Sequence, residues 1–536
     1  MTPSEPPPPV TLREALDAGA EDAAAVVTPE GAVLTHGQLR SEVDRLSSRL
    51  RAFGLGAGSR VAIVLPNGPE MAVAFLAAAC VGCAAPLNPR YRAAELRFYL
   101  EDLAADALIT RPDESGAEAR AAAQHIKGGA GGTSGTNVLA LALNGAAADG
   151  PGSLDFCSET AAASEARRGA ARPRPPTSDD VALVLHTSGT TSRPKIVPLR
   201  QRNLACSATG IAASLALGPE DRSLQVMPLF HIHGLLAGLL APLSAGASVA
   251  CTEGFDAFRF FTQLQELRPS YYTAVPTMHQ MVLSRADRHR GAARAARLRF
   301  VRSSSASLPA PVLVELAELF EAPVVEAYGM TEATHQMCAN PLPPAVAKPR
   351  SVGIPAGVEL AILDPQNRLL PSGGRGEVSI KGPAVIDGYE NNPEADAAAF
   401  SDGWFRTGDE GYLDDDGYLF LTGRFKEQIN RGGEKISPLE VDEALLAHPK
   451  VAQAVTFALA HTKLGEEVAA AVVLVSPADP PDERELRRFV AQSLAAFKVP
   501  RRIVVTDELP KGATGKLQRI GLAERLGLAA ASEDDS

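Results

Sequence analysis

Residues 60–110 constrain the fold more than any other stretch, because short apolar runs alternate there with longer helical patterns. Such alternation is typical of strand–helix–strand units, whose strands form a parallel sheet. The chain has 536 residues, which is more than one hydrophobic core ordinarily serves. We therefore expect an α/β protein with more than one domain.

Changes of pattern divide the rest of the chain. Residues 112–178 are rich in Gly, Ala, Ser and Pro, so we interpret them as a low-complexity surface segment with a possible short strand at VLALAL. Residues 357–421 alternate short strands with turn residues, which predicts an antiparallel β subdomain. We predict a large N-terminal domain at 1–423, a hinge at 424–426 and a small, mobile α+β C-terminal domain at 427–536.

Charge and hydropathy exclude several classes of function. A net charge of −11 argues against nucleic-acid binding, which needs a positive surface. No apolar run approaches the roughly 20 residues that span a bilayer, and neither a signal peptide nor a Ser-Lys-Leu type ending is found. Six scattered cysteines suit a reducing compartment, and we expect Cys80 and Cys83 to be buried packing residues. These features predict a cytoplasmic protein, which we expect to be a monomer or weak homodimer.

The segment HTSGTTSRPKIVPL, residues 186–199, follows the apolar run VALVL. Backbone N–H groups of such a turn converge on one point, and Arg193 and Lys195 add positive charge, so a polyphosphate is the natural ligand. A mobile surface turn is the alternative. The Walker A pattern is absent, which argues against a P-loop NTPase.

Three further stretches carry candidate functional side chains. In VVEAYGMTEATHQMCANP, residues 324–341, Tyr328, Thr331 and Glu332 offer an aromatic ring, a hydroxyl and a carboxylate, which suit a purine, a phosphate and Mg²⁺. Alternatively, Glu332 caps a helix that Thr331 begins. Asp409 ends the RTGD turn, and together with Arg424 it could bind ribose hydroxyls. The alternative is that the two residues form a surface ion pair. Lys516 lies in a Gly-flanked loop near the C-terminus, where a solvated lysine is the ordinary outcome.

In this order and spacing, the four stretches resemble the acyl-adenylate-forming superfamily, which includes acyl-CoA synthetases, adenylation domains of peptide synthetases and firefly luciferase. The resemblance covers about residues 10–525. Within the superfamily, HTSGTTSRPK, AYGMTEATHQM, INRGGEKISPLEVDEALLAHP and AAFKVPRRI look most like the oxalate–CoA ligases of plants and fungi. The resemblance implies an AMP-forming acid–CoA ligase that uses ATP, Mg²⁺ and coenzyme A.

The resemblance also implies roles for individual residues. Lys516, Thr331, Glu332 and His231 become the candidate catalytic residues, and Glu332 would bind Mg²⁺. Lys426 would be the hinge, and Gly432 and Gly433 would leave room for the pantetheine arm of CoA. The residues expected to bind ATP or AMP are Thr187, Ser188, Gly189, Thr190, Thr191, Lys195, Ser304, Ser305, Ala306, Glu326, Ala327, Tyr328, Gly329, Asp409 and Arg424.

The acid substrate is harder to infer. A second carboxylate in a closed pocket needs a cation or hydrogen-bond donors, and the candidates for an oxalate site are His231, His233, Arg302, Ser305 and His335. Each histidine taken alone has a structural or gating role as its alternative. The alternatives are a CoA ligase for a medium-chain fatty, malonic or aromatic acid, and a weakly catalytic protein that binds acyl-nucleotides or acts as an interaction protein. Ile196 stands where relatives typically have Gly, which we expect to restrict the backbone beside Lys195 and to alter loop closure.

Overall fold

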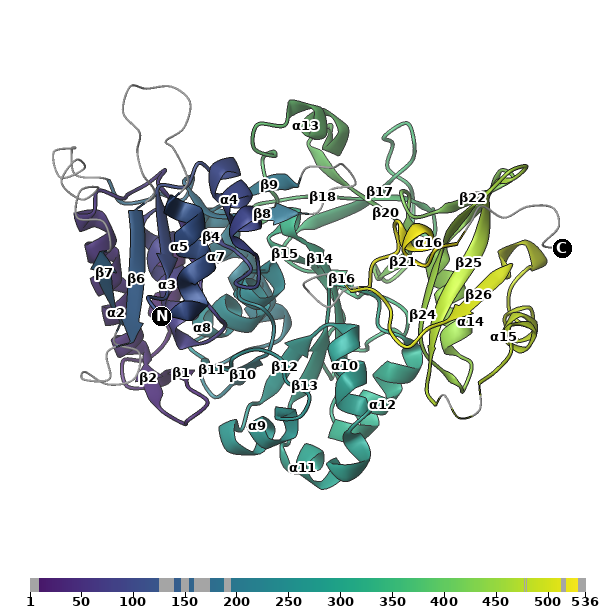
Figure 1. The fold of residues 1–536 in the computed structure, drawn as a ribbon, viewed down its shortest axis with the longest axis horizontal. Coiled ribbons are helices and arrows are strands. Elements are labelled where there is room, and N and C mark those ends of the chain that lie inside the picture. The colour runs from purple at the N-terminus through teal and green to yellow at the C-terminus, as the bar shows by residue number, and fades with distance from the viewer. Residues whose placement is uncertain are drawn as a thin grey trace, which may run out of the picture.

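The structure is a computed structural model that describes residues 9–124, 139–145, 154–158, 174–187, 194–476, 478, 480–511 and 517–528. Four β-sheets with flanking helices form it, and the chain runs from the N-terminal sheet at one end to a smaller C-terminal unit at the other (Figure 1). The expected α/β fold class is confirmed.

A seven-stranded sheet contains the stretch that alternates in the sequence. Its order is β7 (Leu154–Ser158), β6 (Leu139–Gly145), β5 (Ala107–Thr110), β3 (Arg60–Val64), β4 (Cys83–Pro86), β8 (Val181–Thr187) and β9 (Lys195–Arg200). β3 pairs in parallel with β4 and β5, as the alternation predicts. The helices of this region are α1 (Leu12–Ala15), α2 (His36–Ala52), α3 (Pro69–Val81), α4 (Ala93–Asp102) and α5 (Ala117–Gln124), with the 3₁₀ turns η1 (Leu16–Ala18) and η2 (Glu114–Gly116).

Within residues 112–178, which we interpreted as a surface segment, the described parts contain regular elements. α5 packs against α4, β6 pairs in parallel with β5, and β7 pairs antiparallel with β6, so β6 and β7 extend the sheet. The expected strand at VLALAL is present as β6. The sequence did not indicate α5 or β7, because Gly- and Ala-rich residues surround them and a strand of five to seven residues carries little periodic signal.

A nine-stranded sheet follows. Its order is β16 (Ile354–Pro355), β15 (His335–Ala339), β14 (Val324–Met330), β13 (Phe300–Ser303), β12 (Tyr271–Ala274), β10 (Arg222–Gln225), β11 (Ser248–Cys251), β1 (Ala24–Val27) and β2 (Val33–Thr35). The strands from β14 to β1 are parallel, and β15 turns back antiparallel to β14. Its helical elements are α7 (Gln201–Ser214), the π-helical η3 (Gly234–Leu240), α8 (Ala241–Ser244), α9 (Phe260–Leu267), α10 (Pro276–Leu283), η4 (Ala286–Arg288), α11 (Arg290–Ala295), α12 (Ala310–Phe320) and η5 (Thr331–Ala333).

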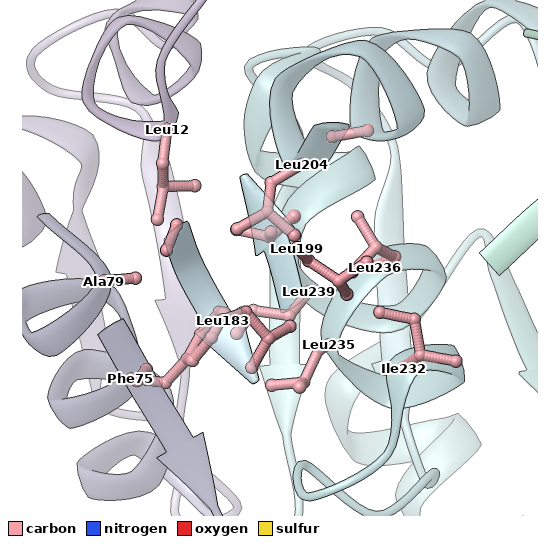
Figure 2. Packing of buried hydrophobic residues seen from close by; sticks show 14 of the residues in the cluster. Leu12, Phe75, Ala79, Leu183, Leu199, Leu204, Ile232, Leu235, Leu236 and Leu239 are labelled. Carbon is pink, nitrogen blue, oxygen red and sulfur yellow. The ribbon is translucent and has the colours of Figure 1, made fainter. Parts of the chain in front are cut away.

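The main core lies between these two sheets. Leu183 on β8 and Leu199 on β9 lie between Phe75 of α3 and the leucines of η3, as Figure 2 shows. α3 is buried all around from Met71 to Val81, as expected of a helix that is apolar on every face. Cys80 and Cys83 are buried, as expected, and burial raises the pKa of each thiol to about 12.

The expected β subdomain is a five-stranded antiparallel sheet with one helix. Its elements are β17 (Glu359–Leu363), β18 (Gly376–Lys381), α13 (Pro393–Ala399), β19 (Phe400–Ser401), β20 (Trp404–Leu413) and β21 (Leu419–Arg424). Gly417, with φ +80°, makes the β20–β21 turn, where positive φ favours glycine.

The C-terminal unit is an α+β sheet with its own two apolar clusters. Its elements are β22 (Ile429–Arg431), β23 (Glu434–Ile436), α14 (Pro438–Leu446), β24 (Val451–His461), β25 (Gly465–Leu474), α15 (Glu483–Val490), η6 (Ala496–Lys498), β26 (Arg502–Val505) and α16 (Leu522–Arg525). Polar contacts join it to the rest: Arg350 forms an ion pair with Glu443, and Gln280 donates to the Ala452 carbonyl at 3.3 Å. No helix in the described ranges is long and apolar enough to cross a membrane.

Candidate active site

The β14–β15 hairpin carries most of the predicted site residues. Gly329 pairs with Gln336, and Met330 pairs with His335. A Cβ atom on Gly329 would lie 1.5 Å from the His335 carbonyl oxygen, so no larger residue fits there. His335 has φ +93°, an unfavourable value for a residue with a side chain, and such strain is concentrated at functional sites.

At one end of the hairpin, Tyr328 meets two residues of the β subdomain. The Tyr328 hydroxyl donates to Asp409 Oδ2, and Arg424 Nε donates to Asp409 Oδ1 at 2.5 Å. Asp409 and Arg424 face each other across β20 and β21, which explains how residues 15 positions apart form a pair. Asp409 is only 5% exposed. The structure thus brings together three residues expected to bind the nucleoside.

The SSSAS turn lies beside this group. Ser304 Oγ donates to the Ala327 carbonyl at 2.8 Å, which ties the turn to β14. Ser305 has φ +74°, and Ala306 is exposed. Burial raises the pKa of Glu326 to about 7, so this side chain holds a proton more readily than an ordinary carboxyl.

A second group connects the phosphate-loop lysine to Glu332. Thr187 and Lys195 pair at the ends of β8 and β9, where they flank the loop. The Lys195 ammonium lies 4.2 Å from the centre of the Tyr389 ring, and the Tyr389 hydroxyl donates to Glu332 Oε1 at 2.9 Å. Burial lowers the pKa of Lys195, while the Glu332 charge opposes that shift.

Glu332 suits Mg²⁺ in one specific way. It is a carboxylate 7% exposed, adjacent to Thr331 and near Lys195. Among the described residues, no group of three or more His, Cys, Asp and Glu side chains could hold a metal ion. A single carboxylate is enough for Mg²⁺ that keeps its waters and takes phosphate oxygens of a nucleotide as further ligands.

On β13, next to the hairpin, the side chain of Arg302 is fully buried. Its Nη1 donates to Thr273 Oγ1 at 3.1 Å and lies 3.4 Å from His233 Nε2, and its Nη2 donates to Gln336 Oε1 at 2.9 Å. None of the carboxylates in the part of the chain that the structure describes forms an ion pair with Arg302. Burial lowers the pKa of Arg302 to about 10, so the guanidinium remains charged at neutral pH.

The histidines around Arg302 are neutral. The rings of His233 and His335 stack with centroids 4.8 Å apart, and burial together with the Arg302 charge lowers the pKa of both. His233 Nε2 lies 2.6 Å from Thr273 Oγ1, and its Nδ1 lies 3.0 Å from Ser305 Oγ. Because the Arg302 guanidinium can only donate, its contact of 3.4 Å with Nε2 makes Nε2 an acceptor, which places the proton of the neutral His233 ring on Nδ1, toward Ser305.

His231 has a different environment from the other two. Its ring lies 4.6 Å from that of Phe230, and its Nε2 is buried without a hydrogen-bond partner. Burial lowers the pKa of His231 to about 4. His335 Nε2 is likewise buried without a hydrogen-bond partner, so both nitrogens have their hydrogen-bonding capacity unused.

The contacts described above do not include several other predicted residues. Ser188, Gly189, Thr190, Thr191 and Lys516, with Arg193, lie outside the described residues. Gly432 and Gly433 form the β22–β23 turn with φ +57° and +97°, so turn geometry already requires glycine there. Lys426 is exposed between β21 and β22, and its charge contributes to lowering the pKa of Lys195.

Tyr389, Thr273 and Gln336 contact the predicted residues but were missed from the sequence. Tyr389 follows a glycine in a loop rich in Asn and Pro, where an aromatic residue was the only available signal. Thr273 and Gln336 are ordinary strand residues, and only the pairing of the strands shows what they touch. Ile196, flagged for its effect on the phosphate loop, lies in β9 and is 8% exposed in a small apolar cluster, a position that suits a β-branched residue.

Comparisons with known proteins give a consistent assignment. The AMP-binding enzyme family model matches residues 12–390, and the AMP-binding enzyme C-terminal domain model matches residues 440–516. An oxalate–CoA ligase of Arabidopsis thaliana is 46% identical over 91% of this chain and 92% of its own. One from Saccharomyces cerevisiae is 41% identical over 87% and 86%. The ATP-bound crystal structure of MatB from Rhodopseudomonas palustris has a TM-score of 0.83 at 28% identity and covers 96% of this chain and 98% of that one. With both family models matched in order and relatives aligned over most of its length, this chain belongs to the AMP-binding enzyme family.

Proposed function

We propose that the protein is an AMP-forming acid–CoA ligase that uses oxalate and produces oxalyl-CoA. The observation that carries the choice of acid is Arg302, a fully buried cation whose hydrogen-bond acceptors are all neutral. The two oxalate–CoA ligases to which the chain is 46% and 41% identical support the same acid.

Electrostatics favours a diacid over a fatty acid. A buried cation without a counter-ion costs several kcal/mol, and an anionic ligand that reaches it removes this cost. When one carboxylate of oxalate reacts, the other still carries a negative charge, which Arg302 matches. The Ser305 hydroxyl, which accepts from His233, keeps its own proton for a carboxylate oxygen.

The reaction has two balanced steps. In the first, a carboxylate oxygen of the acid attacks the α-phosphorus of ATP, the bond to the bridging β-phosphate oxygen breaks, and pyrophosphate leaves. In the second, the CoA sulfur, having lost its proton, attacks the acyl carbon, and AMP leaves with the electrons of the acyl–oxygen bond. AMP makes the second step feasible because it is a far less basic leaving group than oxide.

The residues divide this work by position. Tyr328, Asp409 and Arg424 would hold the nucleoside, while Lys195 and the turn of residues 187–191 would hold the β- and γ-phosphates. Negative charge gathers at the α-phosphate in the first step, so preplaced donors contribute most of the stabilisation. Mg²⁺ at Glu332 would neutralise phosphate charge.

The C-terminal domain would serve the two steps in turn. Lys516 would bridge acid and α-phosphate during adenylation, and rotation at Lys426 would then replace it with the turn at Gly432 and Gly433. We propose the cytoplasm as the location, because Cys80, Cys83, Cys206, Cys251 and Cys338 are free thiols, which a reducing compartment maintains.

The test is a measurement of pyrophosphate, AMP and acyl-CoA formed from oxalate, with malonate and octanoate as competing acids. Oxalate should give the highest kcat/KM, and oxalyl-CoA should be identified by mass. The Lys516→Ala variant should lose adenylation and still transfer a supplied oxalyl-adenylate to CoA. ATP consumption that never yields AMP with any acid contradicts the proposal.

A further inference from the structure

Gln336 lies between the buried arginine and the end of a helix. Its Oε1 accepts from Arg302 Nη2 at 2.9 Å, and its Nε2 donates to Ser214 Oγ at 2.9 Å. Gln336 is 2% exposed. Because a guanidinium can only donate, the amide oxygen must face Arg302, and the contact with Ser214 holds the amide in that orientation.

The chemical character of this contact is unusual for a buried arginine. The ordinary partner is a carboxylate, which forms two charge-assisted hydrogen bonds and cancels the charge. Glutamate has nearly the same shape as glutamine and would do both here. Glutamine provides the hydrogen bond alone, so it positions the guanidinium and leaves its charge uncompensated.

The other neighbours of Arg302 preserve that charge as well. Thr273 accepts through a hydroxyl. Burial lowers the pKa of His233, His335 and His279, so these rings add no charge near neutral pH. The cluster therefore carries one positive charge, which is the number needed for the unreacted carboxylate of a diacid.

We propose that Gln336 is a specificity-determining positioning residue: it fixes Arg302 for the distal carboxylate of the acid and, by being uncharged, reserves the guanidinium for it. This inference rests on the proposed function and deepens it. It predicts that the residue at 336 sets the preference between doubly and singly charged acids of equal size.

The experiment compares oxalate with oxamate, in which a neutral amide replaces the distal carboxylate at nearly unchanged shape. The variant is Gln336→Glu, which adds a charge and little else. A unit charge a few ångströms from the ligand at an effective dielectric constant of about 20 should lower the oxalate-to-oxamate ratio of kcat/KM by about 100-fold. An unchanged ratio, or equal loss with both acids, overturns the proposal.

Gln336→Met is the matched control, because it removes the hydrogen bond without adding charge. It should lower kcat/KM for oxalate by about tenfold and leave that for oxamate within about threefold, so the ratio falls by about tenfold, well short of the fall in Gln336→Glu. A ratio that falls as far as in Gln336→Glu would show that charge at this position is irrelevant, which also overturns the proposal. Thermal unfolding of each variant establishes that it is folded.

If Gln336→Glu does not fold, Gln336→Asn keeps a neutral amide and withdraws it by one methylene. The oxalate KM should then rise about tenfold, as for the loss of a hydrogen bond to a charged group, with the oxamate KM unchanged. Equal effects on both acids contradict the inference. Oxalate binding measured by calorimetry, with a non-hydrolysable ATP analogue present, gives the same comparison without turnover. Failure of the wild-type protein to use oxalate would refute the proposed function, whereas failure of the ratio to respond would refute only the role of Gln336.

Discussion

At the proposed nucleotide end of the site, the buried carboxylate of Asp409 lies 2.5 Å from Arg424, whereas at the proposed acid end Arg302 is fully buried among neutral acceptors. The first pair is complete within the protein. Arg302 has no carboxylate partner among the described residues. In the proposed function, the nucleotide end is therefore organised before binding, while the acid end is completed by the charge of its ligand.

Replacing Arg302 is the most direct test of the difference between the two ends of the site. Arg302→Met should lower kcat/KM for oxalate by about 1000-fold, which is about 4 kcal/mol, because the buried carboxylate loses its partner. The thermal midpoint should stay the same or rise, since an uncompensated buried charge is removed. Arg302→Lys is the control that keeps the charge and loses the planar fork. Oxalate turnover within threefold of wild type would show that this arginine does not bind the acid.

Replacing Asp409, which is already paired with Arg424, should lower the stability of the protein, whereas replacing Arg302 should not. Asp409→Asn leaves Arg424 and the Tyr328 hydroxyl with a weaker partner, so we expect the KM for ATP to rise about 30-fold and stability to fall. Glu410→Gln is the control, since Glu410 is on the same strand and accepts from Thr422. Steady-state kinetics and thermal melts measure both effects. An unchanged KM for ATP in Asp409→Asn would remove Asp409 from the nucleotide site.

Tyr389 tests the group that connects Lys195 to Glu332. Tyr389→Phe keeps the ring below Lys195 and loses the hydrogen bond to Glu332, so half-saturation should need about tenfold more Mg²⁺. Tyr389→Leu also removes the ring, and should raise the KM for ATP further by about threefold. Titration with MgCl₂ and ATP separates the effects. If Tyr389→Phe leaves the Mg²⁺ requirement unchanged, the hydrogen bond has no part in metal binding.

The smallest expected effect is on stability in mild acid. Burial lowers the pKa of His279 to about 3, against about 6.5 in the unfolded chain. The unfolded state then binds more protons between these values, so stability is complete above pH 6.5 and falls as the pH drops below it. From pH 7 to pH 5.5 this histidine should account for about 1 kcal/mol, measured by denaturant unfolding at each pH. His279→Gln should have a correspondingly shallower dependence, and an identical one would assign the loss to other groups.

The sequence predicts regular elements well and contacts between distant strands poorly. The units at 60–110 and the antiparallel strands at 357–421 follow from periodicity, which is a local property. β7 was missed because a short edge strand beside Gly- and Ala-rich segments has little periodicity. Motifs indicated Asp409 and Arg302, but a motif does not say which neighbours are charged. That Gln336 contacts Arg302 depends on strand pairing and on a side-chain direction that only the folded chain defines.

The close approach of Gly329 to the His335 carbonyl has a practical consequence for engineering. β14, which carries Tyr328, and β15, which carries His335 and Gln336, touch there without a side chain between them, so we expect that the two proposed pockets cannot be redesigned separately. Mutant libraries aimed at bulkier acids should leave residue 329 fixed, because any enlargement there would displace β15 and alter the proposed contacts of both strands at the same time.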